Sequence, residues 1–361
     1  MINKFFRPIE EKLPTWIKTE GSYSDVIISS RARLARNLKG FKYHNKLSEK
    51  DAENILKIIN EIFVHNTEFS KNLFLINLNF LPVETKKFLK ERFLATDYMM
   101  KGTNKEIICE LNESYSILVN EEDHLRIQAF EAGFAIDKVF EEVYKISDII
   151  ESRCEYDFSE EFGYLTACPT NAGTGLRLSV MMHLPGIYYT KKNNEIFNSL
   201  NLSGFSIRGI YGEGSDPLGF IYQISNQYTL GESEKETKEK FKKTVLNIYN
   251  IEKESREMLL KSEPDFIINF IKRYLLNFES FDSIRLQDAI KFLSFIRLAA
   301  SFKFLNLYSY SDLNKLLILI QPMHLMNFYF VPLNQFTKDY ENKLRALLIK
   351  KYINKDILKN V

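Results

Sequence analysis

Hydrophobic and polar positions divide this chain into two parts of different texture. From about Asp25 to Leu230, short segments of alternating apolar and polar residues are separated by glycine-bearing turns. From Ser233 onward, apolar residues recur mostly at helical spacing. Alternation is typical of strands and the longer period of helices. The pattern therefore predicts an α+β first part and an all-helical second part, with the domain boundary inside the helix that follows Ser233.

Individual elements follow from the same pattern. Six strands are expected, over Val26–Ser30, Ser114–Val119, His124–Phe130, Leu176–Leu184, Phe205–Ile210 and Phe220–Gln227. An amphipathic helix is expected over Ser48–His65, with Ser48 as its N-cap and Asp51 three positions later. Ser233 and Glu236 form the spacing of a capping box at the start of the helix that crosses the boundary. Further helices are expected over Phe266–Phe278, Asp282–Phe304 and Ser311–Gln321, with Pro264 and Pro322 as stops.

Composition sets limits on the class of protein. The chain has 361 residues, of which 45% are hydrophobic and 14% aromatic, enough for a large core and two domains. A formal charge of +2 gives no general reason to expect nucleic acid or an anionic membrane as partner, so any anion site must be local. The apolar run at Leu316–Met326 is broken by Gln321 and Pro322, so no transmembrane segment is expected.

Location is inferred from the chain start and the cysteines. Residues 1–20 are charged and interrupted by proline, unlike a signal peptide. Cys109, Cys154 and Cys168 are odd in number and unclustered, which favours the reducing cytoplasm over a disulfide framework.

One segment combines several chemical groups. Cys168 is followed by a glycine turn at Gly173–Gly175 and then by Arg177 at the start of a predicted strand. The cysteine is either a buried thiol or a residue at a strand edge, and the neighbouring Pro169 favours the edge. The sequence holds no phosphate loop, dinucleotide turn, zinc helix or paired C-x-x-C.

Five arginines stand near the expected strands. They are Arg31, Arg33, Arg126, Arg177 and Arg208. A single arginine on a strand is usually solvated or ion-paired, but five at comparable positions suggest a cage for a triphosphate. Guanidinium groups are permanently charged and donate paired hydrogen bonds to phosphate oxygens.

Carboxylates and histidines are the other candidates. Glu121, Glu122 and Asp123 form either an exposed acidic turn or the acidic counterpart of the arginines. Glu213 lies in a glycine-rich stretch that is either an ordinary connection or a mobile loop over a substrate. His124 and His183 have no companion at metal-ligand spacing, so we expect them to be hydrogen-bonded structural residues and expect no metal motif.

Together these blocks resemble the phosphagen (guanidino) kinase family, in matching order. The blocks are SSRARLARN from Ser29, NEEDHLRI from Asn120, CPTNAGTGLR from Cys168 and RGIYGEGS from Arg208. Within that family the chain resembles the bacterial protein arginine kinases, through PTWIKTEG before Asp25 and GFIYQISNQYTLG over Gly219–Gly231. The resemblance is strong from about Trp16 to Gly231 and weak in the helical part.

The resemblance implies a fold and a division into domains. We expect an α+β guanidino-kinase catalytic domain, with a large and mainly antiparallel sheet flanked by helices, over 25–255. It follows a lead-in at 1–24 and precedes a helical domain at 256–361 that supports dimerisation and substrate engagement.

It also implies site residues. Glu122 would be the base, Glu213 a second carboxylate, and Cys168 a thiol beside the guanidinium. The implied ATP site comprises Ser29, Ser30, Arg31, Ala32, Arg33, Arg92, Arg126, Arg177, Leu178, Ser179, Val180, Met181, Arg208, Gly209, Ile210, Tyr211, Gly212 and Glu213. The nucleotide would be Mg-ATP, with Mg²⁺ held mainly by nucleotide and water.

Three positions depart from the family pattern. Lys86, a substrate-site candidate, stands where the family has an arginine, and Arg92 stands where it has a nucleotide-contacting histidine. The phosphoarginine-binding motif R-D-x-x-R-A is degenerate here, since only Arg345 and Ala346 match and Glu341 takes the place of its first arginine. We therefore expect sensing of free phosphoarginine to be weakened or lost.

The function implied by the resemblance is ATP-dependent phosphorylation of arginine in proteins. It would mark proteins for a Clp-type protease in a cytoplasmic stress response, with an activator protein and a Clp ATPase as possible partners and a homodimer as the assembly. Three alternatives stay open: a small-molecule guanidino kinase, a phosphoarginine or Clp adaptor that has lost catalysis, and a cysteine hydrolase using Cys168 with His183 or His124.

Overall fold

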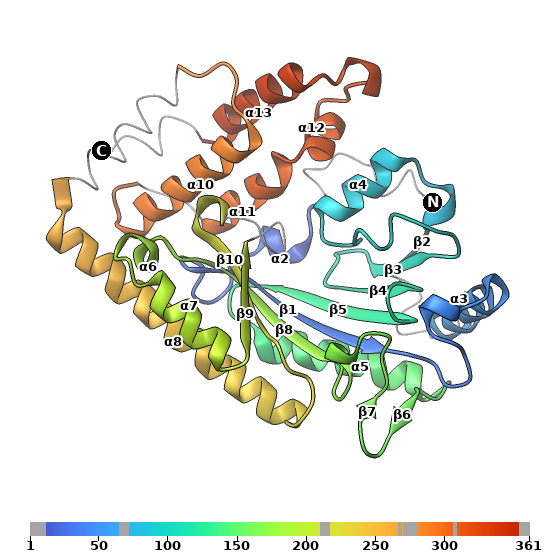
Figure 1. The fold of residues 1–361 in the computed structure, drawn as a ribbon. Coiled ribbons are helices and arrows are strands. Elements are labelled where there is room, and N and C mark those ends of the chain that lie inside the picture. Colours follow the sequence, from blue (N-terminus) through green and yellow to red (C-terminus); the bar gives the residue numbers. More distant parts are fainter. Residues whose placement is uncertain are drawn as a thin grey trace.

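An eight-stranded antiparallel sheet is the centre of the molecule (Figure 1). The computed structural model describes residues 12–64, 72–209, 217–265, 269, 280–305 and 309–353. The strands of the sheet, in spatial order, are β2 (Leu73–Asn77), β3 (Glu106–Glu110), β4 (Tyr115–Val119), β5 (Leu125–Ala132), β1 (Ile27–Arg36), β8 (Leu176–His183), β10 (Ile221–Asn226) and β9 (Phe205–Gly209). A separate hairpin joins β6 (Phe158–Ser159) to β7 (Gly163–Tyr164).

The expected α+β fold with a large antiparallel sheet is confirmed. All six predicted strands are present within a few residues, although β1 runs on to Arg36 instead of ending at Ser30. Strands β2 and β3 were not predicted. β3 is buried along most of its length, so its residues EIICE carry almost no alternation.

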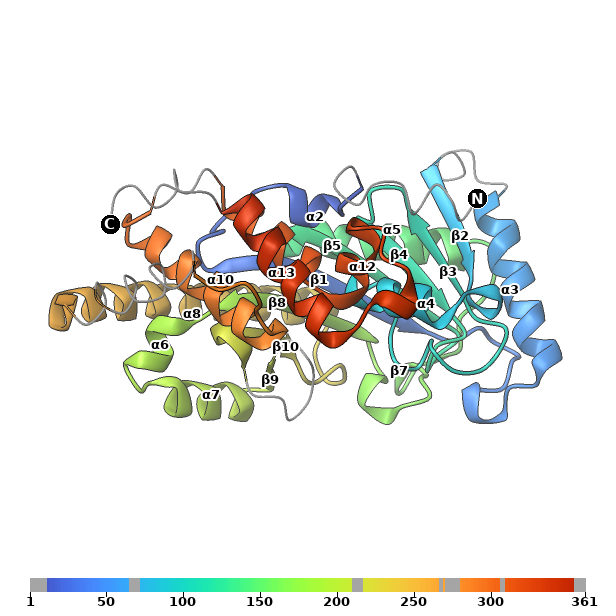
Figure 2. The same ribbon diagram turned by 90° about the horizontal axis from the view of Figure 1, so that it is seen from above.

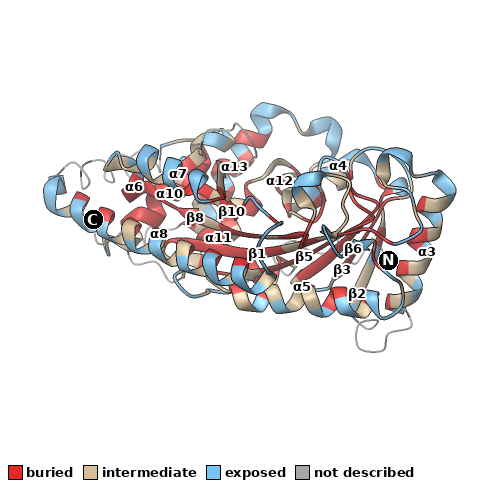
Figure 3. Cartoon of the chain, turned by 60° about the horizontal axis from the view of Figure 1, so that its bottom comes forward, coloured by how far each residue is buried: buried red, intermediate tan, exposed pale blue. Residues whose placement is uncertain are grey.

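One face of the sheet carries the larger core. It is covered by α3 (Glu49–Val64), α5 (Ile136–Glu151), α6 (Pro185–Tyr189), α7 (Asn193–Leu202) and α8 (Glu234–Ser262). Figure 3 shows the buried strands directly above α5 and α8, whose outer sides are exposed.

The two predicted helix starts are confirmed. The Asp51 N–H donates to Ser48 Oγ at the start of α3, and Ser233 and Glu236 form the capping box of α8. The expected boundary at residues 255 and 256 falls inside α8, which runs unbroken through it.

The opposite face of the sheet carries the C-terminal helices and the N-terminal lead-in (Figure 2). The elements on this side are α2 (Thr15–Lys18), α4 (Val83–Glu91), α10 (Leu286–Ser301), α11 (Tyr310–Leu319), α12 (Pro322–Phe328) and α13 (Lys338–Tyr352). Ile28, Phe130 and Ile221 of the sheet share one apolar cluster with Trp16 and Ile290. The C-terminal helices therefore close over one end of the sheet.

Two of the three expected C-terminal helices are described. α10 begins at Leu286, four residues after the predicted Asp282, and α11 spans Tyr310–Leu319. Pro322 does more than end α11, because it also begins α12. The helix expected over Phe266–Phe278 lies outside the described residues.

The short 3₁₀ helices are η2 (His44–Lys46), η4 (Leu78–Phe80), η5 (Pro169–Asn171), η6 (Leu218–Phe220) and η7 (Leu333–Gln335). Among the helices that the structure describes, none is long and apolar enough to cross a bilayer.

Candidate active site

Strand register brings the predicted arginines onto one face of the sheet. Arg33 of β1 lies opposite Arg177 of β8, and Arg31 lies opposite Ser179. On the other side of β1, Arg33 pairs with Gln128 and Ala35 with Arg126 of β5. Directly paired residues in an antiparallel ladder project to the same side. Arg31, Arg33 and Arg126 all line a cleft of about 730 Å³ between this face and the C-terminal helices.

The charge of this arginine cluster is not balanced by the carboxylates around it. Burial, together with repulsion from Arg126 and Arg177, lowers the pKa of Arg31 to about 9 against the attraction of Glu121. Burial and the same neighbours, together with Arg31, lower the pKa of Arg33 well below its ordinary range. In the described part of the chain, the Nε atoms of both Arg31 and Arg33 are buried without a hydrogen-bond acceptor. Unpaired buried donors with positive charge fit an anionic ligand.

Arg177 and Arg208 extend the basic face toward the edge of the sheet. Arg177 donates to Ser206 Oγ and Ser225 Oγ, each at 3.1 Å, so both serines hold its guanidinium in place. Arg208 of β9 pairs with Gln223 of β10, which in turn pairs with Met181 of β8. Met181 and Gln223 line the same cleft.

Four of the strand residues expected to contact ATP face away from the cleft. Ala32, Leu178 and Val180 belong to the apolar core on the opposite face. Ser30 also points there, since its hydroxyl donates to Gly133 O and accepts from the Ala135 N–H. Strand alternation allows only every second residue to reach one face, so these four side chains are removed from the expected site.

The remaining strand residues of the expected site lie on the cleft side, except Gly209, whose partner Tyr222 belongs to the core on the opposite face. Ser29 pairs with Met181, and Ser179 pairs with both Arg31 and Ser225. Gly209 ends β9. Ile210, Tyr211, Gly212 and Glu213 lie outside the described residues.

The acidic residues 121–123 form the turn between β4 and β5, and each has a different environment. Glu121 is buried, forms an ion pair with Arg126 and accepts hydrogen bonds from Thr96 Oγ1 and the Glu122 N–H. Burial opposes its ionisation, but Arg126 and these hydrogen bonds outweigh it and lower its pKa. Glu122 is only half-buried, and burial and its two acidic neighbours raise its pKa. Glu121 is therefore held as a carboxylate, whereas Glu122 keeps a proton more readily than an exposed glutamate.

Asp123 joins this turn to the cysteine segment. Its Oδ1 accepts from the Ala167 N–H at 2.6 Å and from Asn37 Nδ2 at 2.7 Å. Cys168, the next residue, is half-buried, and its Sγ lies 3.0 Å from Thr170 Oγ1. It precedes η5 and stands outside any strand, as its edge position predicted. The structure thus brings Cys168 and Glu122 into one neighbourhood.

Two glycines anchor the chain between Cys168 and Arg177. Gly173 has a φ of 101°, and a Cβ on it would lie 2.2 Å from Thr229 O. Gly175 has a φ of 62°, and a Cβ there would lie 2.6 Å from Ala35 O. Both positions need the positive φ and the close backbone approach that glycine allows.

The histidines are structural, as expected. His124 Nδ1 accepts from the Leu38 N–H and its Nε2 lies 3.0 Å from Lys42 O. His183 is fully buried, with Nε2 2.8 Å from Ser294 Oγ and Nδ1 3.3 Å from Arg256 Nη2. Because both rings use both nitrogens elsewhere, neither can act as the base of a cysteine hydrolase at Cys168.

Arg92 is a correction to the expected nucleotide site. Its side chain is 1% exposed, forms a buried ion pair with Glu113 and donates to Lys12 O. Its guanidinium is therefore engaged inside the protein rather than presented to the cleft, and we leave it out of the site. Lys86 on α4 is half-buried and close enough to lower the pKa of Lys105, which places it near the acidic turn.

Sequence reasoning missed the apolar walls of the cleft. They include Trp16, Phe93, Ile221, Ile290 and Leu317, which come from five separate segments. Trp16 stacks on Phe130 with centroids 5.6 Å apart, and Phe93 meets Trp16 edge-on at 6.0 Å. The single tryptophan was visible in the sequence, but nothing local indicated that α10 and α11 would complete the wall.

The degenerate motif in α13 forms a buried ion pair rather than an open site. Arg345 is fully buried, forms an ion pair with Glu341, and donates to Ile320 O, Ile284 O and Asn342 Oδ1. Ala346 is buried beside it. Glu341 thus occupies the guanidinium that would otherwise hold a phosphate.

No group of three or more His, Cys, Asp or Glu side chains positioned to hold a metal ion occurs in the described ranges. The cationic side chains that line the cleft are Arg31, Arg33, Arg126, Lys87 and Lys90, which fit phosphate oxygens and do not ligate a cation.

Comparison with known proteins agrees with this geometry. Residues 54–255 match the family ATP:guanido phosphotransferase, C-terminal catalytic domain, and residues 268–359 match the Protein-arginine kinase McsB C-terminal domain. The chain is 34% identical to a protein-arginine kinase of Clostridium tetani over 95% of this chain and 99% of that one. It is also 34% identical to a protein-arginine kinase of Bacillus pumilus over 98% of this chain and 96% of that one.

Among solved structures, lombricine kinase superposes with a TM-score of 0.58 and 23% identity over 67% of this chain and 69% of that one, which shows a shared fold. The combination of a matching catalytic domain, a matching C-terminal domain and near full-length relatives leads to one conclusion. The chain belongs to the protein-arginine kinase family of ATP:guanido phosphotransferases.

Proposed function

We propose that this protein transfers the terminal phosphoryl group of ATP to arginine side chains of proteins. The observation that carries the proposal is the meeting of the unbalanced arginine cluster with the acidic turn and Cys168. The arginine cluster would bind the anion that donates the phosphoryl group, and the acidic turn with Cys168 would bind the cationic guanidinium that accepts it. Relatives along nearly the whole chain are named protein-arginine kinases, which favours a protein acceptor.

The donor half of the site would hold the triphosphate. Arg31, Arg33, Arg126 and Arg177 would bind the phosphates and neutralise the charge that spreads over the transferred oxygens. The adenine ring of the nucleotide would pack against the wall formed by Trp16 and Phe93. Mg²⁺ would arrive with ATP and supply further charge neutralisation.

The acceptor half would activate a guanidinium. An arginine side chain has a pKa above about 12, so it must lose a proton before its nitrogen can attack phosphorus. Glu122, with its raised pKa, takes that proton as the N–P bond forms and the terminal P–O bond of ATP breaks to release ADP. Cys168 would lie beside the guanidinium as a tuning thiol and form no covalent bond to the phosphoryl group. By family resemblance, Glu213 would supply the second carboxylate.

The test is a phosphorylation assay with mass spectrometry. The protein is incubated with Mg-ATP and an unfolded, arginine-rich protein, and acid-labile phosphate on arginine is sought. We expect a signal that disappears in Glu122→Ala and falls sharply in Cys168→Ala. Full activity of Glu122→Ala would refute its assignment as the base, and turnover of free arginine or creatine at the same rate would favour a small-molecule guanidino kinase.

The cellular role is proposed from family resemblance alone. We infer that the protein acts in the cytoplasm as a homodimer and marks stress-damaged proteins for a Clp-type protease, with an activator protein and a Clp ATPase as partners. The adaptor alternative loses part of its support, because Arg92 acts in a buried ion pair and is not a damaged nucleotide contact.

A further inference from the structure

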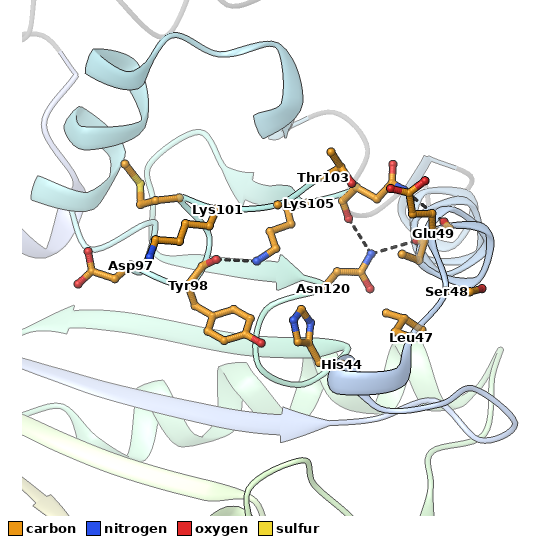
Figure 4. A pocket seen from close by; sticks show the side chains of 14 residues that line it. His44, Leu47, Ser48, Glu49, Asp97, Tyr98, Lys101, Thr103, Lys105 and Asn120 are labelled. Atoms are coloured by element: carbon orange, nitrogen blue, oxygen red, sulfur yellow. Dashed lines mark hydrogen bonds between the residues drawn. The ribbon is translucent and has the colours of Figure 1, made fainter.

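A second cavity, of about 820 Å³, is lined in part by Asn120, the residue that precedes the acidic turn (Figure 4). It is formed by η2, the start of α3 and the segment from Asp97 to Lys105, and Asn120 closes its inner end. Asp97 lines both this cavity and the nucleotide cleft. Both cavities therefore lie next to the turn that carries Glu122.

The most unusual feature of this cavity is a buried lysine without an acidic partner. Lys105 is 4% exposed, and its Nζ donates to Tyr98 O and lies 4.4 Å from the centre of the Tyr98 ring. Within the described ranges, no carboxylate lies within ion-pair distance of this ammonium group. A lysine is rarely buried unless it is paired. Lys105 therefore marks a place for an anion.

Two further polar atoms of the cavity have no partner. Asn120 is 3% exposed, and its Nδ2 donates to Ala52 O at 3.0 Å and Asn104 O at 2.7 Å. These bonds fix the orientation of the amide and leave its Oδ1 buried without a donor in the described part of the chain. His44 Nδ1 is likewise buried and unpartnered. An occupant that supplies an N–H would satisfy Asn120, because an unpaired buried acceptor is costly.

The cavity is electrostatically linked to the acidic turn. Glu121 acts on both Lys105 and His44, and the carboxylates of Glu121 and Glu122 act on Tyr98. Leu47, Ala52 and Met100 supply apolar lining. A ligand with a carboxylate, an apolar stem and an N–H donor would match Lys105, this lining and Asn120, although Glu49 and Asp97 also line the cavity.

We propose that this cavity is a subsite for the polypeptide around the acceptor arginine and that it binds a glutamate side chain next to that arginine. The glutamate carboxylate accepts from Lys105, its methylene groups cover the apolar lining, and a main-chain N–H of the substrate donates to Asn120 Oδ1. This inference rests on the proposed function and adds a substrate preference to it.

The experiment compares capped peptides that contain one arginine flanked on both sides by glutamate, by glutamine or by lysine. Initial rates of arginine phosphorylation are measured with Mg-ATP at low ionic strength. We expect kcat/KM for the glutamate peptide to exceed that for the glutamine peptide about tenfold, the effect of one charge-assisted hydrogen bond. The lysine peptide should be the poorest, and the difference should reside in KM.

Lys105→Met should bring the ratio of glutamate to glutamine peptide close to one. The ratio is taken within one variant, so a general loss of activity does not affect it. The matched control is Lys46→Met, which removes an exposed lysine of the neighbouring η2 and should keep the wild-type ratio.

A wild-type ratio near one would overturn the subsite even if Lys105→Met fails to fold. An unchanged ratio in folded Lys105→Met would overturn it too. Phosphorylation of unfolded protein without any peptide preference would leave the proposed function standing, whereas absence of arginine phosphorylation from all substrates would refute both. Free arginine, tested as a further acceptor, should not compete with the glutamate peptide at equal concentration.

Discussion

Replacement of Arg33 by methionine should stabilise the protein without nucleotide and weaken nucleotide binding. Arg33 is half-buried on the floor of the cleft. Burial lowers its pKa, and repulsion from Arg31, Arg126 and Arg177 acts in the same direction. Its Nε has no acceptor in the described residues. Methionine keeps a similar length and removes the charge, so the folded state loses repulsion while losing no hydrogen bond that the structure shows for this side chain.

The pKa of the neighbouring Arg31 gives a scale for the expected gain in the free energy of unfolding. Its pKa is lowered to about 9, which at about 1.4 kcal/mol per pKa unit corresponds to roughly 5 kcal/mol of unfavourable free energy. That figure is an upper bound, because both side chains retain contact with solvent at the cleft and are screened by it. We expect Arg33→Met to gain about 1–3 kcal/mol and its melting midpoint to rise by about 2–6 °C.

The assay is thermal unfolding in a buffer without phosphate or sulfate, with and without Mg-ATP. Mg-ATP should raise the midpoint of the wild type and raise that of the variant much less, since stabilisation by a ligand follows its affinity. The KM for ATP should rise at least tenfold in the variant. Arg153→Met is the control, because it removes an exposed arginine outside the cleft and should change neither quantity.

A lower midpoint of Arg33→Met without nucleotide would refute this reasoning. It would mean that Arg33 has stabilising partners and that the cluster is not held open for an anion. If Mg-ATP raised the melting midpoint of the variant as much as that of the wild type, Arg33 would not be part of the nucleotide site.

Of four further predictions, three concern carboxylates and one concerns free phosphoarginine. Glu122→Gln should lower kcat by about 10²–10⁴-fold. The acid limb of the wild-type kcat/KM profile should lie above pH 4.5, because the pKa of Glu122 is raised. An acid limb near pH 4 would argue against Glu122 as the base. Burial raises the pKa of Glu91 from 4.5 to about 8, so the folded protein keeps a proton that the unfolded chain releases, and its stability should fall as pH rises from about 5 to 8. Glu91→Gln should make the melting midpoint depend less on pH over this range. The same pH dependence in the variant and the wild type would contradict the assignment. Glu341→Ala should cost about 3–5 kcal/mol in unfolding experiments by leaving Arg345 buried and unpaired. Free phosphoarginine should not activate the wild type, and activation that Arg345→Ala abolishes would show this to be wrong.

Much of the donor half of the site could be predicted from local sequence. Alternation along β1 places Arg31 and Arg33 on one face, and the same parity in β8 places Arg177 and Met181 together. The same rule should have excluded Ala32 and Leu178, which the family motif had carried into the site. A motif marks a stretch of chain, whereas strand geometry decides which of its side chains reach the ligand.

The acidic turn was visible in the sequence, but its division of roles was not. Glu121 and Glu122 are adjacent and chemically identical. Their pKa values move in opposite directions because the ion pair of Arg126 and the hydrogen bond of Thr96 are made with Glu121, whereas burial and the acidic neighbours dominate at Glu122. Those partners come from different segments, so only folding could distinguish the ion-paired carboxylate from the one proposed as the base.

The sequence by itself determined six of the strands, the capped helices, the basic face and the family, because these depend on periodicity and short motifs. Tertiary structure decided what covers that face and which charges stay unpaired. Arg92 became an internal ion pair through contact with Glu113, while Lys105 was left buried beside Tyr98 without one. The physical reason is that burial and pairing depend on residues far apart in the chain, and no local pattern of hydrophobic and polar positions records them.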